Sequence, residues 1–84
     1  MKMNRLQYKT DGSGNRFLEI PFGWNAPNEL LRITYVEPYE GKPEPTIRLQ
    51  KTVDNHPYQG PEPEFKNIPL LAEVLLKIYN DFKQ

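Results

Sequence analysis

The residues best suited to chemistry in this sequence are cations, amides and one phenylalanine that recur at every second position. In residues 46–50, for example, Arg48 and Gln50 alternate with Ile47 and Leu49. Because neighbouring side chains of a β-strand point to opposite faces, this alternation separates a polar from an apolar face. The predicted polar face carries Arg5, Gln7, Lys9, Phe17, Glu19, Arg32, Thr34, Arg48, Gln50 and Thr52.

A face of this composition suits single-stranded nucleic acid. Cations contact phosphates, an aromatic ring can stack on a base, and amides or hydroxyls bond phosphates or base edges. The chain has 11 basic and 11 acidic residues and no net charge. The polar face nevertheless has four cations, Arg5, Lys9, Arg32 and Arg48, against the single anion Glu19. The alternative is that these residues only keep a solvent-facing sheet soluble and protect its edges.

Catalytic and metal-binding chemistry have no comparable pattern. The sequence lacks cysteine and has one histidine, His56, and one serine, Ser13, which fall in different predicted turns. Residues 11–15, "DGSGN", begin like a calcium-binding loop, but its sixth and twelfth positions, a glycine and a glutamate in such loops, are Arg16 and Phe22 here. We therefore predict a hairpin turn there, and a protein that is not an enzyme and has no metal or cofactor.

The elements that must position the polar face are four predicted strands at residues 4–10, 16–22, 30–37 and 46–53. The first two flank the glycine-rich turn. Because Pro21 cannot donate to a ladder, the second strand either ends there or has a free edge. Gly41 can supply a positive φ in the turn at 38–45, and residues 54–65 form a loop or a short irregular strand. A helix is predicted at 68–82, with Asn67 as its cap and Pro69 in its first turn. The predicted fold class is α+β, a single domain over residues 1–84: a four-stranded antiparallel meander followed by one C-terminal helix (β-β-β-β-α).

The predicted helix is apolar around more than half of its circumference. Glu73, Lys77, Asn80 and Asp81 form its only compact polar strip. The apolar face of the sheet is expected to lie against the helix and carries Leu6, Tyr8, Leu18, Ile20, Leu31, Ile33, Ile47 and Leu49. One sheet cannot cover so wide an arc. Either the 54–65 segment covers the remainder, or a second subunit packs on the helix. The homodimer interface predicted in the second case is Leu71, Leu75, Leu76, Ile78, Tyr79 and Phe82.

The sequence also bears on location. The first ten residues lack the apolar core of a signal peptide, and no stretch approaches the roughly 20 apolar residues of a membrane-spanning helix. We expect a soluble, cytoplasmic protein without a membrane partner.

Residues 46–79, "TIRLQKTVDNHPYQGPEPEFKNIPLLAEVLLKIY", resemble the ending of the transcriptional positive coactivator family of single-stranded-DNA-binding proteins. The Whirly proteins share that type of fold. The similarity is one of pattern and covers roughly the last forty residues: a strand with "IR", a Pro/Gly connection, a short segment and a helix. The family's basic stretch before the helix is the acidic "GPEPEF" here, followed by Lys66. The resemblance implies a dimerising helix, and Arg48 and Lys51 as the main phosphate contacts.

Two functions follow as expectations. The first is a non-enzymatic domain that binds single-stranded DNA or RNA through Arg5, Lys9, Phe17, Arg32, Arg48, Gln50 and Lys51. The alternative is a small protein-interaction module, an accessory subunit or inhibitor, that uses its C-terminal helix or its acidic proline-rich turns.

Overall fold

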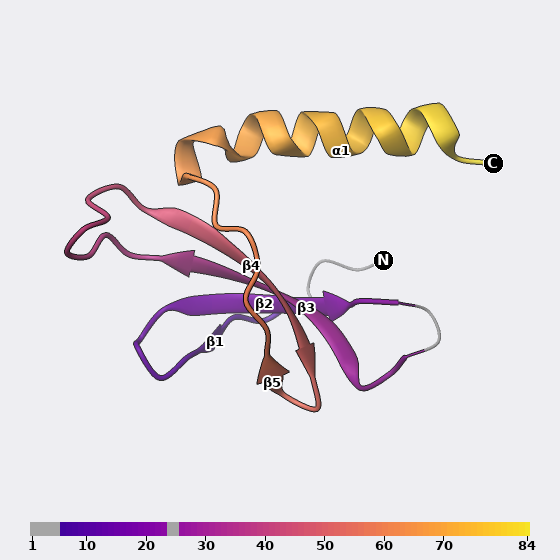
Figure 1. Cartoon of the computed structure of the whole chain (residues 1–84). Helices are drawn as coiled ribbons and strands as arrows, with labels where there is room; N and C mark the ends of the chain where they lie inside the picture. Colours follow the sequence, from indigo (N-terminus) through magenta and orange to yellow (C-terminus); the bar gives the residue numbers. More distant parts are fainter. Residues whose placement is uncertain (1–5, 24–25) are drawn as a thin grey trace.

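A computed structural model describes residues 6–23 and 26–84. Within these ranges the chain is α+β, with a five-stranded antiparallel sheet followed by one C-terminal helix (Figure 1). Each strand pairs with its neighbour in sequence, in the order β1-β2-β3-β4-β5, so the sheet is a meander. The elements are β1 (Lys9–Thr10), β2 (Arg16–Pro21), β3 (Glu29–Val36), β4 (Thr46–Val53), β5 (His56–Pro57), the 3₁₀ turn η2 (Phe65–Asn67) and α1 (Ile68–Phe82).

The predicted elements agree with this structure in type and differ in extent. β4 and α1 have the predicted bounds, and β2 ends at Pro21 as expected. Gly41 has a positive φ of 85° in its turn. The first strand was predicted over residues 4–10, but within the described residues only Lys9–Thr10 pair with β2. The fifth strand comes from the 54–65 segment, where the sequence left open a loop or a short irregular strand.

The start of α1 differs from the prediction in one respect. Asn67 makes no side-chain capping hydrogen bond. The reason is that η2 runs directly into α1, so Asn67 has helical dihedral angles (φ −93°, ψ −2°) instead of the extended ones that a capping side chain needs. Pro69 lies in the first turn, where its missing N–H costs nothing.

The buried residues lie on the face that was expected to face solvent. The strand register places Phe17, Thr34, Val36, Thr46 and Thr52 on the polar face, and all five are buried. The side chains of the apolar face, by contrast, are at most half-buried. The strongly twisted sheet seen in Figure 1 therefore curls with its polar face inside. The apolar face does lie toward the start of α1, as expected, but it is not the more buried side, because no layer of the described chain is laid fully over it.

A strap formed by residues 58–65 continues from β5 along the edge of β4. The backbone N–H groups of Leu49 and Ile47 donate to the carbonyls of Pro61 and Pro63, each over 2.9 Å. Phe65 donates in turn to the carbonyl of Pro45. Proline carbonyls accept these bonds, and since proline has no N–H, Pro61 and Pro63 return no hydrogen bond to β4. The strap thus fixes where α1 begins relative to the sheet.

Gly60 is the point of closest approach between the strap and β4. A Cβ atom built on Gly60 would overlap the backbone carbonyl oxygen of Leu49, whereas one on Gly12 would meet nothing within 4 Å. We expect Gly60→Ala to lower the free energy of unfolding by about 1–3 kcal/mol, because the strap must move away from β4. Urea unfolding followed by circular dichroism measures this, with Gly12→Ala as the matched control. Equal stability of the two variants would contradict the account of the strap.

Candidate functional site

The polar face brings most of the predicted nucleic-acid-binding residues together. In the register of the sheet, Lys9 lies opposite Phe17, which lies opposite Thr34, which lies opposite Arg48. The neighbouring row runs from Glu19 through Arg32 to Gln50. Lys9, Phe17, Arg32, Arg48 and Gln50 therefore share one face, as predicted. Arg5 lies outside the described residues.

Lys51 is on the other side of the sheet. It pairs with Leu31, and its Nζ lies 3.2 Å from Glu29 Oε1 and 5.1 Å from the centre of the Phe22 ring. Because neighbouring residues of a strand alternate in direction, Lys51 and Arg48 cannot contact one strand of nucleic acid on the same face. The two phosphate contacts that the resemblance implied, Arg48 and Lys51, thus lie on opposite faces of the sheet.

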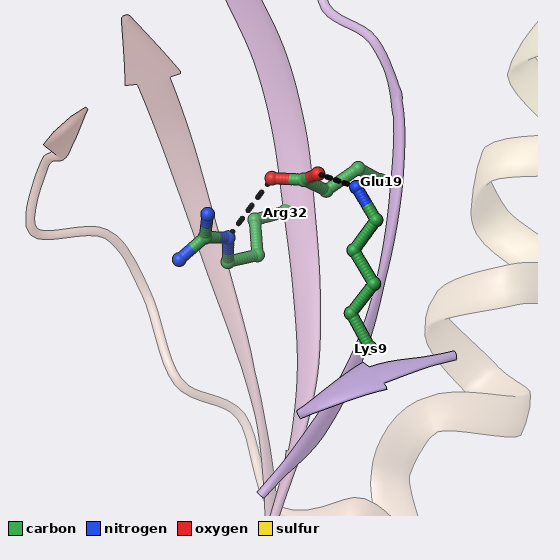
Figure 2. A network of polar contacts seen from close by, with 3 residues as sticks. All are labelled: Lys9, Glu19 and Arg32. Atoms are coloured by element: carbon green, nitrogen blue, oxygen red, sulfur yellow. Dashed lines mark hydrogen bonds and ion pairs between the residues drawn. The ribbon is translucent and has the colours of Figure 1, made fainter. Parts of the chain in front are cut away.

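The described cations of the polar face, Lys9, Arg32 and Arg48, are bound to carboxylates. In Figure 2 the carboxylate of Glu19 lies between Arg32 and Lys9, with Arg32 Nε 3.0 Å from Oε2 and Lys9 Nζ 3.5 Å from Oε1. Arg48 Nε donates to Glu62 Oε1 over 2.8 Å. The excess of positive charge on the polar face is thus largely neutralised. Glu19 lies on the same face, and the strap brings Glu62 next to Arg48.

Phe17 offers no free ring to a base. Phe17 is only 6% exposed, and the guanidinium carbon of Arg32 lies 4.2 Å from the centre of its ring. Arg32 is itself held by Glu19, so the ring is covered by a fixed cation. The prediction of an exposed stacking surface at Phe17 is therefore wrong.

Glu62 is the residue of this candidate site that the sequence pattern did not indicate. Its second carboxylate oxygen, Oε2, accepts a 2.7 Å hydrogen bond from the Thr46 hydroxyl. One signal was available: Glu62 and Glu64 alternate with Pro61 and Pro63, which is the period of an extended segment. The proline content favoured a connector instead.

The hydrogen bond from Thr46 is the main reason that the pKa of Glu62 lies below its ordinary value, with Arg48 adding to the effect. The pKa of Arg48 is raised, chiefly by its hydrogen bond to Glu62. Desolvation opposes both shifts. The net directions favour the charged pair, so Glu62 and Arg48 are both ionised at neutral pH.

This shift makes stability depend on pH in a definite direction. A carboxyl whose pKa is lowered by folding stabilises the protein at pH values above its pKa in the unfolded state. That contribution is lost as the pH falls through its pKa in the folded state. We expect Glu62→Gln to cost about 1–2 kcal/mol at neutral pH and nothing in acid, where the wild-type group is protonated too. Unfolding in urea at a series of pH values from about 7 to about 3 measures this. Glu64→Gln is the control, because Glu64 is half exposed and its ion pair with Lys66 is long, at 3.8 Å. A pH-independent difference would contradict the role of Glu62.

The apolar face forms the second candidate site, together with the start of α1. A groove of about 440 Å³ separates them and has no polar residue in its lining. The lining residues are Ile20, Leu31, Ile33, Ile47, Leu49, Ile68, Leu71, Ala72 and Leu75. A second hollow of about 700 Å³ lies between the strap and the other side of α1, where Leu70 and Val74 face Pro61 and Pro63. The described chain thus leaves apolar surface uncovered on both sides of the first turns of α1.

Helix α1 contains no buried residue. Of the predicted interface residues, Leu71 is half-buried in the groove, and Leu75, Leu76, Ile78, Tyr79 and Phe82 are 52–78% exposed. Figure 1 shows α1 as a layer beside the sheet, connected to it through the strap. Because the strap lies along β4, it does not cover the wide apolar arc of α1. The explanation that residues 54–65 cover this arc is therefore wrong, and the second subunit stays a prediction.

Two other findings concern the described residues alone. Residues 6–23 and 26–84 contain no group of three or more histidine, aspartate or glutamate side chains placed to hold a metal ion. In the same ranges, α1 is too short and too polar to cross a membrane, and no other helix approaches that length.

Comparison of the chain with protein-family models, with curated proteins and with solved structures gives no match. The resemblance to the positive coactivator and Whirly proteins therefore stays a prediction from the sequence pattern.

Proposed function

We propose that this protein is a non-enzymatic interaction module, a small subunit that binds another protein chain through the apolar surface formed by α1 and the apolar face of the sheet. The observation that carries the proposal is the exposure of large apolar side chains along α1, up to 78% at Phe82. Soluble monomers rarely leave contiguous apolar patches of this kind uncovered, and such patches mark interaction sites.

The small core of the isolated chain supports the same proposal. Phe17 and Val36 are the buried hydrophobic residues of the described chain, and the other buried side chains are threonines. Ordering a residue costs about 1–2 kcal/mol in backbone entropy, which burial of apolar area must offset. Covering α1 and the apolar face would add the burial that the chain alone lacks. The predicted homodimer through α1 is the simplest assembly that does so, and a cytoplasmic location belongs to the same proposal.

The test is the mass of the purified chain by light scattering at tens of micromolar, together with affinity capture of any stoichiometric second chain. A matched variant, Phe82→Glu, charges the apolar surface at its most exposed position. The proposal expects self-association or a stoichiometric partner, and the loss of either in Phe82→Glu. A strict monomer that captures no stoichiometric chain, with identical behaviour of the variant, would overturn it.

Binding of single-stranded nucleic acid is the second candidate function. It is favoured by the register, which places Lys9, Arg32, Arg48 and Gln50 in adjacent rows of one face. A phosphate would have to compete with Glu19 and Glu62 for the guanidinium groups, so we propose weak binding that is sensitive to salt.

For this candidate, Glu62→Gln and Arg48→Ala have opposite expected effects. Removing the carboxylate of Glu62 frees Arg48 for a phosphate and should strengthen binding, while Arg48→Ala should weaken it for all sequences alike. Fluorescence anisotropy with a labelled oligonucleotide over a salt series measures both. No binding at ~50 mM salt, or binding without a falling log–log slope, would exclude the candidate.

A further inference from the structure

We infer that the occupant of the apolar surface is a second copy of this chain, placed so that the far end of α1 in each copy lies over the apolar face of the other. This inference rests on the proposed function and names its partner. It follows from the way in which two uncovered surfaces of one chain complement each other.

The first observation is that one apolar stripe of α1 lies against the chain's own sheet only along the first half of the helix. Ile68, Leu71, Ala72 and Leu75 line the groove against the chain's own sheet. At 100° per residue, Ile78, Tyr79 and Phe82 continue this stripe within the same arc of about 120°. These three residues, the distal stripe, are not among the residues that line this groove, and they are 52%, 64% and 78% exposed.

The second observation is that the groove needs an apolar occupant. Its floor is formed by half-buried residues of β2, β3 and β4, among them Ile20, Ile33 and Leu49, and its lining is entirely apolar. The distal stripe supplies large apolar side chains and lacks an apolar surface to cover them. In a two-fold dimer every contact occurs twice, so one reciprocal arrangement covers both surfaces of both copies.

Charge does not oppose the pairing of two copies. The chain has no net charge. On the polar strip of α1, Lys77 Nζ donates to Asp81 Oδ2 over 2.9 Å, so these two charges are balanced within each helix. Two identical surfaces of this kind do not repel each other strongly.

The chain exposes more surface than a compact monomer of its mass, by an amount that a dimer interface could cover. The chain exposes 6994 Å², whereas a folded monomer of 9.9 kDa exposes about 5,200 Å². The excess is roughly 1,800 Å² per copy, or about 3,600 Å² for two, within the range of about 2,000–5,000 Å² that obligate homodimers bury.

Cysteine pairing tests this arrangement directly, since the natural chain has no cysteine to give a background. Ile33→Cys places a thiol on the floor of the groove, and Ile78→Cys places one on the distal stripe. The two single variants, mixed and oxidised, should form a disulfide-linked heterodimer of twice 9.9 kDa. Gln50→Cys, on the opposite side of β4, is the control and should give at least about tenfold less product with Ile78→Cys.

Each other outcome has a distinct meaning. If a double variant that carries both Ile33→Cys and Ile78→Cys closes a disulfide within one chain at high dilution, while the wild type sediments as a monomer, the helix folds onto its own sheet and both proposals fail. If the wild type is a monomer that captures a stoichiometric different protein, the inference is overturned and the proposed function stands. The mass of the unmodified wild type, from sedimentation equilibrium, decides the matter even if a cysteine variant does not fold.

Discussion

Ile78→Glu is expected to convert the assembled protein into monomers at tens of micromolar. Ile78 is the first residue of the distal stripe and is 52% exposed in the isolated chain. In the dimer its side chain becomes buried, and a carboxylate there would have to lose its hydration without a partner. Burying an unpaired charge costs several kcal/mol, and each 1.4 kcal/mol is a factor of ten in the dissociation constant. We therefore expect Kd to rise at least about 100-fold.

Sedimentation equilibrium measures this change, and Asn80→Glu is its control. Asn80 belongs to the polar strip of α1, so the control adds the same charge to the same helix on the side that faces solvent. The control should keep the mass of the wild type. An unchanged mass in Ile78→Glu, or an equal loss in both variants, would contradict an interface on the distal stripe.

Phe17→Ala has the second large expected effect. Phe17 is the larger of the two buried hydrophobic residues of the described chain, and its ring packs under the guanidinium of Arg32. Truncation leaves a cavity on the inside of the curl and removes the cation–π contact. Phenylalanine-to-alanine changes at buried sites cost about 3–5 kcal/mol. Small domains have a total stability of about 5–15 kcal/mol, so this variant should be close to unfolding at room temperature.

Urea unfolding at fixed protein concentration measures the loss of stability, because self-association would make the apparent stability depend on concentration. Phe22→Ala is the matched control, since Phe22 is 50% exposed and its ring lies beside Lys51. It should cost about 1 kcal/mol or less. Equal losses in the two variants would mean that the polar face is not the buried side of the sheet.

The order and type of the main elements could be predicted from the sequence because local periodicity determines them. The helical spacing of Leu71, Val74, Leu75 and Ile78 gave the bounds of α1, and the alternation from Thr46 to Val53 gave β4. The same alternation placed Arg32 and Arg48 on one face correctly. These features depend on neighbours in the chain and need no knowledge of distant contacts.

The side of the sheet that is buried could not be predicted in the same way. Alternation tells which residues share a face, but the choice of the inner face depends on the twist of the sheet and on where α1 lies. Thr34 and Thr52 are almost completely buried, although threonine is common on solvent-facing strands. The assumption that α1 covers its own sheet led to the wrong choice.

The pairing of charges was missed for a related reason. Glu62 and Arg48 are fourteen residues apart, and only the strap along β4 brings them within 2.8 Å. Glu19 and Arg32 are partners because β2 and β3 pair in one particular register. A count of charges on a predicted face therefore overestimated the basic character of that face.

Amide hydrogen exchange of α1 at two protein concentrations tests the central claim most directly. The claim is that the far end of α1, residues 76–82, is covered by a second copy of the chain and not by its own sheet. It predicts that the amides of residues 76–82 are protected as strongly as those of β3 at high concentration, and that they lose protection on dilution below Kd. Protection of residues 76–82 that is independent of concentration in a protein that sediments as a monomer would contradict the claim.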